Sequence, residues 1–152
     1  AGPGVNQGSI TGLFTVLVDG DDNNEPVADA VRGILDGHVV MSRRIAERGR
    51  YPAIDLLKSV SRTLPHAHSE DENTLRLAAR SVLSLYADME EMVRLGAYKT
   101  GASPEVDRAI ALAPRIEALL GQGKSDRGGR VESFAALAEI LATGADIEEN
   151  PS

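Results

Sequence analysis

The hydrophobic pattern of this chain changes character along its length. Over residues 10–18 the apolar positions form a nearly unbroken run, which is typical of a strand buried on both faces of a parallel sheet. An acidic, turn-rich loop follows, and Pro26 then suits the first turn of a helix with an apolar stripe. Residues 38–41 predict a second short strand. Strand, helix and strand in this order predict a right-handed βαβ unit.

Helical patterns dominate the rest of the chain. Ser42 is expected to cap a short helix that Gly49 ends. Ser69 and Glu72 then make a capping-box pattern, which predicts the start of a long helix. Its apolar residues recur at helical spacing until Gly96 ends the run.

Two further helices are expected. Ser103-Pro104 marks the start of the first, and Pro114 is expected to kink or break it, because the ring removes a hydrogen bond and clashes with the preceding turn. The glycine-rich segment 121–130 is predicted to be a flexible linker. Apolar residues at helical spacing over 134–141 then predict a last short helix.

These patterns predict three parts: an incomplete α/β portion over 1–64, a helical domain over 65–145, and a disordered acidic tail over 146–152. Two parallel strands do not make a stable sheet, because their open edges need further strands or a covering partner. The chain also begins without Met, on a loop-like Ala-Gly-Pro-Gly. We therefore expect it to be the C-terminal piece of a longer protein.

Composition narrows the class of protein. Hydrophobic residues at 42% and charged residues at 26% describe a soluble globular protein. The chain lacks an apolar run of the roughly 20 residues that a membrane span needs. The formal net charge of −7 argues against nucleic-acid binding, which needs a surface that neutralises phosphates. The absence of cysteine excludes a disulfide framework and a thiolate metal site.

Three local motifs that look like binding sites fail their full patterns. Gly123-Lys124-Ser125 ends like a phosphate-binding loop, but Ala118 stands where the pattern needs glycine, and a helix rather than a strand precedes it. The acidic loop at 19–25 fails the EF-hand pattern at its sixth and twelfth positions. His66 and His68 lack a third ligand at a suitable spacing, so we predict no metal site.

The best candidate site is the stretch 51–62, Tyr-Pro-Ala-Ile-Asp-Leu-Leu-Lys-Ser-Val-Ser-Arg. Tyr51 precedes Pro52 and is therefore held extended, so its ring has a stiff mount. A fixed aromatic ring and the single arginine, Arg62, suit a nucleotide, with the ring on the base and the arginine on phosphate. The alternative, which the residue types alone favour, is that Tyr51 fills a seam between layers and Arg62 caps carbonyls.

The order of motifs along the chain resembles a known family. Tyr-Pro-Ala-Ile-Asp followed by Ser-Val-Ser-Arg resembles the segment after the last core strand of hexameric rotary-type ATPases. Four further segments resemble the branch that serves flagellar and type III secretion export: 8–11, 16–26, 34–40 and 94–98. Together these matches extend over nearly the whole chain.

The resemblance implies an α/β fold, namely the last βαβ portion of a RecA-like P-loop ATPase core followed by a mainly α-helical C-terminal domain. It implies that the full-length protein is a homo-hexameric ATP hydrolase that uses ATP and Mg²⁺ to energise protein export. The family's phosphate-binding loop and metal ligands would precede Ala1. The chain alone is therefore expected to be inactive.

The resemblance also implies roles for individual residues. Tyr51, with Pro52, takes the place that packs on the adenine of the subunit's own nucleotide, where stacking contributes about 1–3 kcal/mol per base. Arg62 takes the place of an arginine finger that acts in trans on the neighbouring subunit's nucleotide. Three acidic residues fall where relatives contact a central stalk in the hexamer pore: Asp21, Asp22 and Glu25.

The implied partners are a coiled-coil stalk protein, a regulator and export chaperone–substrate complexes, with no nucleic acid. The implied location is cytoplasmic, docked at the inner-membrane export apparatus through those partners. The segment 99–103 lacks the acidic run of rotary synthases, which favours the export branch, and Leu119 replaces a common Phe near the adenine. Two alternatives remain: a non-enzymatic helical adaptor that binds secretion chaperones or a coiled coil, and a rotary ATP synthase catalytic subunit.

Overall fold

The structure is a computed structural model of the chain that describes residues 8, 10–17, 30, 32–64 and 66–143. These residues belong to two units, one ending at Leu35 and one beginning at Asp36. In the first unit, residues 30 and 32–34 are helical, within the helix predicted to start at Pro26. The acidic loop at 19–25 and the tail at 146–152 lie outside the described residues.

The prediction of a strand at 10–18 is wrong for its described part. Residues 10–17 form no strand, and Leu13 and Leu17 are 96% and 93% exposed. A strand forms only where a neighbour takes up its backbone amides and carbonyls. Among the described residues, the two strands that exist pair with each other. The apolar run therefore indicates a segment that needs a partner surface to cover it. The run by itself does not determine that partner.

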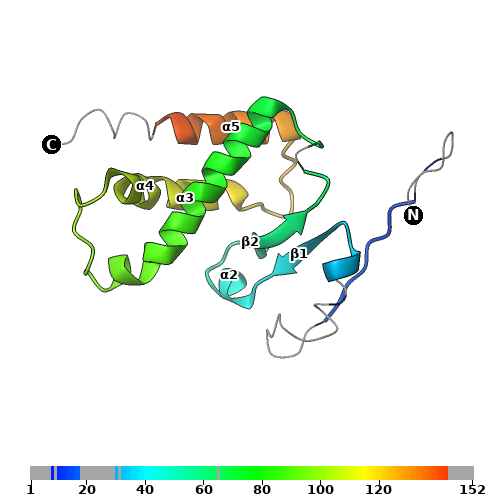
Figure 1. Cartoon of the computed structure of the whole chain (residues 1–152), viewed down its shortest axis with the longest axis horizontal. Helices are drawn as coiled ribbons and strands as arrows, with labels where there is room; N and C mark the ends of the chain where they lie inside the picture. The colour runs from blue at the N-terminus through cyan, green and yellow to red at the C-terminus, as the bar shows by residue number, and fades with distance from the viewer. Residues whose placement is uncertain (1–7, 9, 18–29, 31, 65, 144–152) are drawn as a thin grey trace. The chain divides into compact units, whose positions relative to one another are not determined.

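The sheet of the second unit consists of β1 (Gly37–Met41) and β2 (Ile54–Ser61), joined through the short helix α2 (Arg43–Glu47). β1 confirms the strand predicted at 38–41, but its neighbour is β2 and the pairing is antiparallel. Gly49, at a φ of 82°, lets the chain turn back after α2. The α/β class itself is confirmed, since this sheet is followed by a mainly helical part (Figure 1).

The first long helix, α3 (Glu70–Arg94), begins at the predicted capping box. Ser69 Oγ accepts a hydrogen bond from the Glu72 amide at 3.2 Å, and Glu72 Oε2 accepts one from the Ser69 amide at 2.9 Å. Gly96 follows the helix at a φ of 68°, as a helix-ending glycine does. The short helix predicted after Ser42 is confirmed as α2, with Ser42 at its N-cap position, but the Ser42 side chain makes no capping hydrogen bond.

The second long helix, α4 (Pro104–Leu120), begins at Ser103-Pro104 as predicted, and the Ser103 side chain caps it. The expected break at Pro114 is wrong, because the helix continues through this residue to its end. Pro114 is exposed, whereas Leu112 and Ile116 on the opposite side are 1% and 2% exposed. Burial of that apolar face offsets the backbone hydrogen bond that proline removes.

The last predicted helix is confirmed as α5 (Arg130–Ala142). The three long helices enclose one core, made of Ala79, Val82, Leu83, Ala109, Leu112, Ala113, Ile116 and Leu141. Leu57 of β2 packs against this core, so the sheet and the helices are joined by apolar contact. Within the described ranges, none of the helices is both long and apolar enough to cross a membrane.

Candidate functional site

Tyr51 lies just before β2 and presents most of its surface to solvent. It is 59% exposed, so it does not fill a packed seam within the described part of the chain. Its carbonyl oxygen accepts a hydrogen bond from the backbone amide of Gln122 at 2.7 Å. The peptide bond from Tyr51 to Pro52 is cis. The ring thus stands exposed on a backbone that the segment after α4 helps to hold.

Arg50 fastens the same corner of the sheet. Its Nη2 donates to Ile54 O at 2.9 Å and its Nη1 to Pro52 O at 3.4 Å. Its Nε lies 2.6 Å from Glu117 Oε2 of α4, and the Arg50 side chain is only 11% exposed. A guanidinium that is largely shielded from water interacts more strongly with its carboxylate than an exposed one. Arg50 therefore ties the start of β2 to the helices.

The sequence analysis identified Tyr51 but missed the residues that hold it. Arg50 had a local signal, because it is a basic residue next to the Tyr-Pro pair. Glu117 and Gln122 had no local signal, since each lies more than 60 positions after Tyr51 in the sequence. They contact this corner of the sheet only in the folded chain.

Arg62 follows the last residue of β2 and begins a turn. It is exposed, and its backbone amide donates to Asp36 O at 2.7 Å. Beside it, Ser61 Oγ and Thr63 Oγ1 lie 2.8 Å apart and share a hydrogen bond. The hydroxyl groups on either side of Arg62 in the sequence, Ser61 and Thr63, are therefore hydrogen-bonded to each other.

Gly37 lets β1 approach β2 closely at this end of the sheet. A Cβ at this position would lie 2.7 Å from Val60 O and 3.2 Å from the Cα of Ser61, closer than packed atoms allow. Both are backbone atoms, which do not rotate away as a side-chain tip does. Glycine is thus required beside Arg62, and the sequence did not reveal this because the contact joins distant positions.

Tyr51 and Arg62 lie beyond opposite ends of the sheet. β1 has five residues and pairs along β2. The distance between the first and last Cα atoms of β1 is about 13 Å. Tyr51 precedes one end of β2 and Arg62 follows the other. This arrangement allows one strand to present an aromatic ring to one binding site and a guanidinium to another.

Glu72 and Arg130 form an ion pair that links the starts of α3 and α5. Arg130 Nε donates to Glu72 Oε1 at 2.9 Å, and its Nη2 contacts Oε2. These hydrogen bonds, followed by that from the Ser69 amide, hold the pKa of Glu72 at about 2, below its ordinary value of 4.5. Because the pair joins two helix ends, its role is to hold the helices together.

The turn between α3 and α4 is held by Tyr98 and Asp107. Tyr98 Oη lies within hydrogen-bonding distance of Asp107 Oδ1 and of Ser103 O, at 3.0 and 3.1 Å. Asp107 Oδ2 accepts from the amide of Gly101 at 2.8 Å. Burial raises the pKa of the Tyr98 hydroxyl, and the Asp107 carboxylate raises it further. The turn is therefore a fixed structure stabilised by its own side chains.

The weaker sequence motifs acquire structural explanations. Gly123-Lys124-Ser125 follows helix α4, not a strand, and the Gly123 amide donates to Asp126 Oδ2 at 2.7 Å. The ring of His68 packs edge-on against Phe134, with centroids 5.3 Å apart. The described residues hold no group of three or more His, Cys, Asp and Glu side chains placed to bind a metal. The stalk candidates lie outside the described residues: Asp21, Asp22 and Glu25.

Two family models match consecutive parts of the chain. The model described as the ATP synthase alpha/beta family, nucleotide-binding domain, matches residues 1–61. The model described as the T3SS EscN ATPase C-terminal domain matches residues 68–139. Together with the sheet and the three helices, these matches define the class of protein: part of a nucleotide-binding domain of the ATP synthase alpha/beta family, followed by a helical C-terminal domain of the EscN type.

Individual relatives narrow the class. The flagellum-specific ATP synthase of Caulobacter vibrioides is 57% identical over 138 residues, which are 91% of this chain and 31% of that protein. The assembled ATPase EscN from the enteropathogenic E. coli type III secretion system gives a TM-score of 0.81 at 33% identity, over 89% of this chain and 33% of that chain. EscN in complex with its central stalk EscO gives 0.69 at 31% identity, over 76% and 29%.

The chain spans about a third of the length of these relatives. It belongs to the family of flagellar and type III secretion ATPases.

Proposed function

We propose that this chain is the C-terminal third of a homo-hexameric ATP hydrolase that energises protein export through a flagellar or type III secretion apparatus. The observation that carries the proposal is the pair of family matches over 1–61 and 68–139. The nucleotide-binding match argues against a free-standing adaptor. The secretion-type C-terminal match favours export over the second candidate, a rotary ATP synthase catalytic subunit.

Within this enzyme, Tyr51 and Pro52 pack on the adenine of the subunit's own nucleotide, and Arg62 is an arginine finger that acts on the neighbouring subunit's nucleotide. The exposure of Tyr51 supports stacking, because 59% of its surface is available to a ligand. The placement of the two residues beyond opposite ends of the sheet supports their serving two different sites.

Bound ATP with Mg²⁺ supplies the phosphoanhydride bond that is hydrolysed. Arg62 contributes a planar, permanently charged fork, which stabilises negative charge developing on the transferred phosphoryl oxygens. Tyr51 contributes binding energy and orientation through its ring. Because Gly123-Lys124-Ser125 follows a helix rather than a strand, it provides no phosphate-binding loop. We therefore expect the chain alone to be inactive.

The proposal extends to partners and location. The structure of EscN in complex with its central stalk EscO supports a coiled-coil stalk as partner. We place the stalk contact at the acidic loop, on Asp21, Asp22 and Glu25, from its position in the sequence. We further propose a regulator and export chaperone–substrate complexes as partners, in the cytoplasm and docked at the inner-membrane export apparatus.

A subunit-mixing experiment tests the finger. Arg62→Ala in the full-length enzyme is expected to leave nucleotide binding by single subunits nearly intact and to lower the turnover of the assembled enzyme by about 10³-fold or more. Arg62→Lys is expected to restore only part of this loss, because a point charge does not reproduce the two-pronged contact of guanidinium. Arg62→Ala subunits are then mixed with subunits that lack the lysine of the phosphate-binding loop.

The mixture separates action in trans from action in cis. If Arg62 acts across the interface, some interfaces pair an intact finger with an intact phosphate site, and part of the activity returns. A mixture as inactive as both parents, with assembly verified by size-exclusion chromatography, would show that Arg62 acts within its own subunit or only supports the fold.

A further inference from the structure

The two strands are not paired evenly along their length. β1 is paired at His38 and again at Val40, but the β2 residues opposite them are Val60 and Asp55. Residues 56–59, which we call the β2 bulge, therefore lie opposite a single residue of β1. A bulge takes backbone amides and carbonyls out of the ladder, so other groups must satisfy them.

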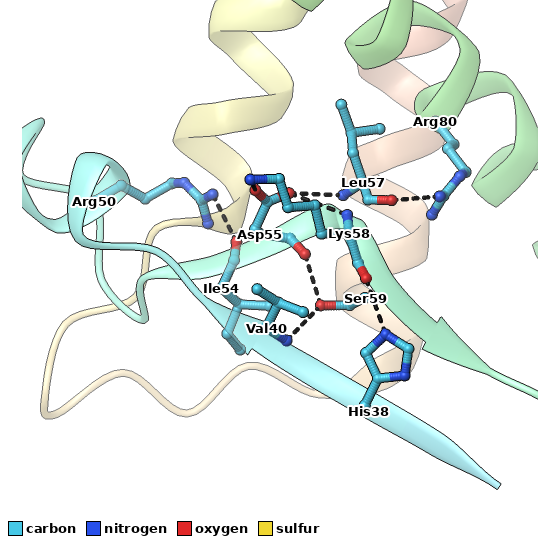
Figure 2. A network of polar contacts seen from close by, with 9 residues as sticks. All are labelled: His38, Val40, Arg50, Ile54, Asp55, Leu57, Lys58, Ser59 and Arg80. Atoms are coloured by element: carbon cyan, nitrogen blue, oxygen red, sulfur yellow. Dashed lines mark hydrogen bonds and ion pairs between the residues drawn. The ribbon is translucent and has the colours of Figure 1, made fainter. Parts of the chain in front are cut away.

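Side chains of the sheet satisfy part of the β2 bulge. Asp55 Oδ1 accepts hydrogen bonds from the amides of Leu57 and Lys58, at 3.2 and 3.1 Å. Ser59 Oγ donates to Asp55 O at 2.6 Å and accepts from the Val40 amide at 3.0 Å. These contacts, drawn in Figure 2, close the neck of the bulge onto β1.

Two further side chains reach the carbonyl groups of the bulge. His38 Nε2 lies 3.2 Å from Lys58 O, and because a carbonyl oxygen only accepts, Nε2 carries the hydrogen in this contact. Arg80 comes from helix α3, outside the sheet. Its Nη1 donates to Leu56 O at 3.0 Å and its Nη2 to Leu57 O at 2.6 Å. Figure 2 shows the Arg80 side chain reaching from the helix toward Leu57.

The β2 bulge is thus a point where the sheet is attached to the helices. Leu57 makes the apolar part of the attachment, since it packs against the helical core. Arg80 makes the polar part, and its rigid fork supplies two donors to two consecutive carbonyls, which an ammonium group does not reproduce. Arg80 is only partly exposed, so water screens these charge-assisted bonds less than it would at the open surface.

We infer that Arg80 is a positioning residue for the arginine finger, acting through the β2 bulge. The inference rests on the proposed role of Arg62. Beyond the bulge, β2 continues only through Val60 and Ser61 before Arg62 begins the turn. The shape of the bulge therefore contributes to the direction in which Arg62 leaves the sheet, together with the bond from the Arg62 amide to Asp36 O. Arg80 fixes two carbonyls of the bulge and thereby contributes to its shape.

The other end of β2 is held independently of Arg80. Tyr51 lies before the bulge. The neighbouring Arg50 is paired with Glu117 of α4, and the Gln122 amide donates a hydrogen bond to the Tyr51 carbonyl. Removal of Arg80 consequently displaces the finger and leaves the adenine-stacking residue in place. This difference separates a positioning role from a general contribution to folding, which would affect both ends.

The test uses the full-length enzyme with Arg80→Met, which keeps the length and apolar character of the stem. Because a displacement of about 1 Å costs up to about 10²-fold in rate, Arg80→Met is expected to lower kcat by about 10- to 100-fold. KM and the Kd for a fluorescent ATP analogue are expected to change by less than about twofold. Arg80→Lys, which reaches one carbonyl at a time, is expected to retain intermediate kcat.

A matched control lies one turn earlier on the same helix. Arg76 is also partly exposed, and its Nε donates to Asn73 of α3 at 3.4 Å. Arg76→Met removes the same charge from the same element and is expected to leave kcat within about twofold of wild type, as a change away from the bulge does. Circular dichroism and size-exclusion chromatography verify folding and assembly of each variant.

The decisive measurement repeats Arg80→Met in an Arg62→Ala background, by single turnover so that slow rates remain measurable. If Arg80 acts through the finger, the second substitution has nothing left to displace and lowers the rate no further. An equal fold-loss in both backgrounds would overturn the inference, as would wild-type kcat in both Arg80→Met and Arg80→Lys. Wild-type kcat for Arg62→Ala alone would instead overturn the proposed finger itself. If Arg80→Met does not assemble, the same cycle with Arg80→Lys decides.

Discussion

The helical part of the molecule and strand β2 owe their shapes to different interactions. The three long helices are held by an apolar core that contains Leu112 and Ile116, which are 1% and 2% exposed. β2 has a half-buried surface and a bulge, and directional bonds from Asp55, Ser59 and Arg80 hold it. The apolar core therefore stabilises the helical part, whereas directional hydrogen bonds fix the shape of β2.

This division fits the proposed function. Apolar packing does not fix the orientation of individual side chains, since many arrangements of similar volume bury a similar area. A stacking ring and an arginine finger need a defined position instead, and hydrogen bonds with fixed distances and angles provide it. The two residues proposed to act on nucleotide flank the strand that such bonds shape, and the side chains that shape it come partly from α3 and α4.

The largest effect on the stability of the helical part is expected from a cavity in its core. Leu112→Ala is expected to lower the free energy of unfolding by about 2–5 kcal/mol, because the vacated volume does not collapse completely. Denaturant unfolding followed by circular dichroism measures it. Leu77→Ala on α3, where the residue is 56% exposed, is the control and is expected to change stability by less than about 0.5 kcal/mol. Equal losses for both variants would show that the core does not carry the stability.

The complementary substitution acts on function with little effect on stability. Tyr51→Ala in the full-length enzyme is expected to weaken nucleotide binding by about 1–3 kcal/mol, because the ring no longer stacks on the base. Turnover at saturating ATP is expected to change little. Titration with a fluorescent nucleotide measures the affinity, and Tyr51→Phe, which keeps the ring, is expected to bind as wild type does. Wild-type affinity for Tyr51→Ala would rule out stacking.

The sequence predicted the helical part well because each of its signals is local. The capping box at Ser69 and Glu72, the apolar period of α3 and the ending at Gly96 all lie within one turn of the feature that they specify. The error at Pro114 has the same origin. A local rule predicted a kink or a break, and the break is wrong because the burial of Ile116 against residues far along the chain keeps the helix continuous.

The sheet was predicted less well because strand partners are not local. The apolar run at 10–18 predicts a strand, but its described residues 10–17 form none, and β1 pairs with β2. At the candidate site, the sequence identified Tyr51 and Arg62 as chemically suited to nucleotide, and their roles stay predictions. It did not identify Arg80, whose two bonds to β2 cross 24 and 23 positions of the chain.

Helix capping sharpens the contrast between local signals and tertiary structure. Ser69→Ala is expected to destabilise the chain by about 1 kcal/mol, because the Glu72 amide loses its side-chain acceptor. Ser42 occupies the same position before α2 but makes no capping bond, so Ser42→Ala is expected to change stability by less than about 0.5 kcal/mol. Thermal unfolding of the two variants decides, and a larger loss at Ser42 would contradict the assigned caps.

The smallest expected effect concerns the pH dependence of the Glu72–Arg130 pair. Folding lowers the pKa of Glu72 from 4.5 to about 2, chiefly through the hydrogen bonds from Arg130. A carboxyl whose pKa is lowered on folding stabilises the folded state above its unfolded pKa, and this contribution is lost as the pH falls from about 4.5 through about 2. Water screens the pair in part, because the Arg130 side chain is 54% exposed.

Thermal unfolding measured across this pH window tests the linkage. Glu72→Gln keeps a similar shape and does not titrate, so its melting temperature is expected to fall less steeply with decreasing pH than that of wild type, and the two curves converge at the acid end. Arg130→Met removes the main cause of the pKa shift and is expected to flatten the curve in the same way, with the Ser69 bond retained. Parallel pH curves for wild type and both variants would show that the pair does not couple the two helices.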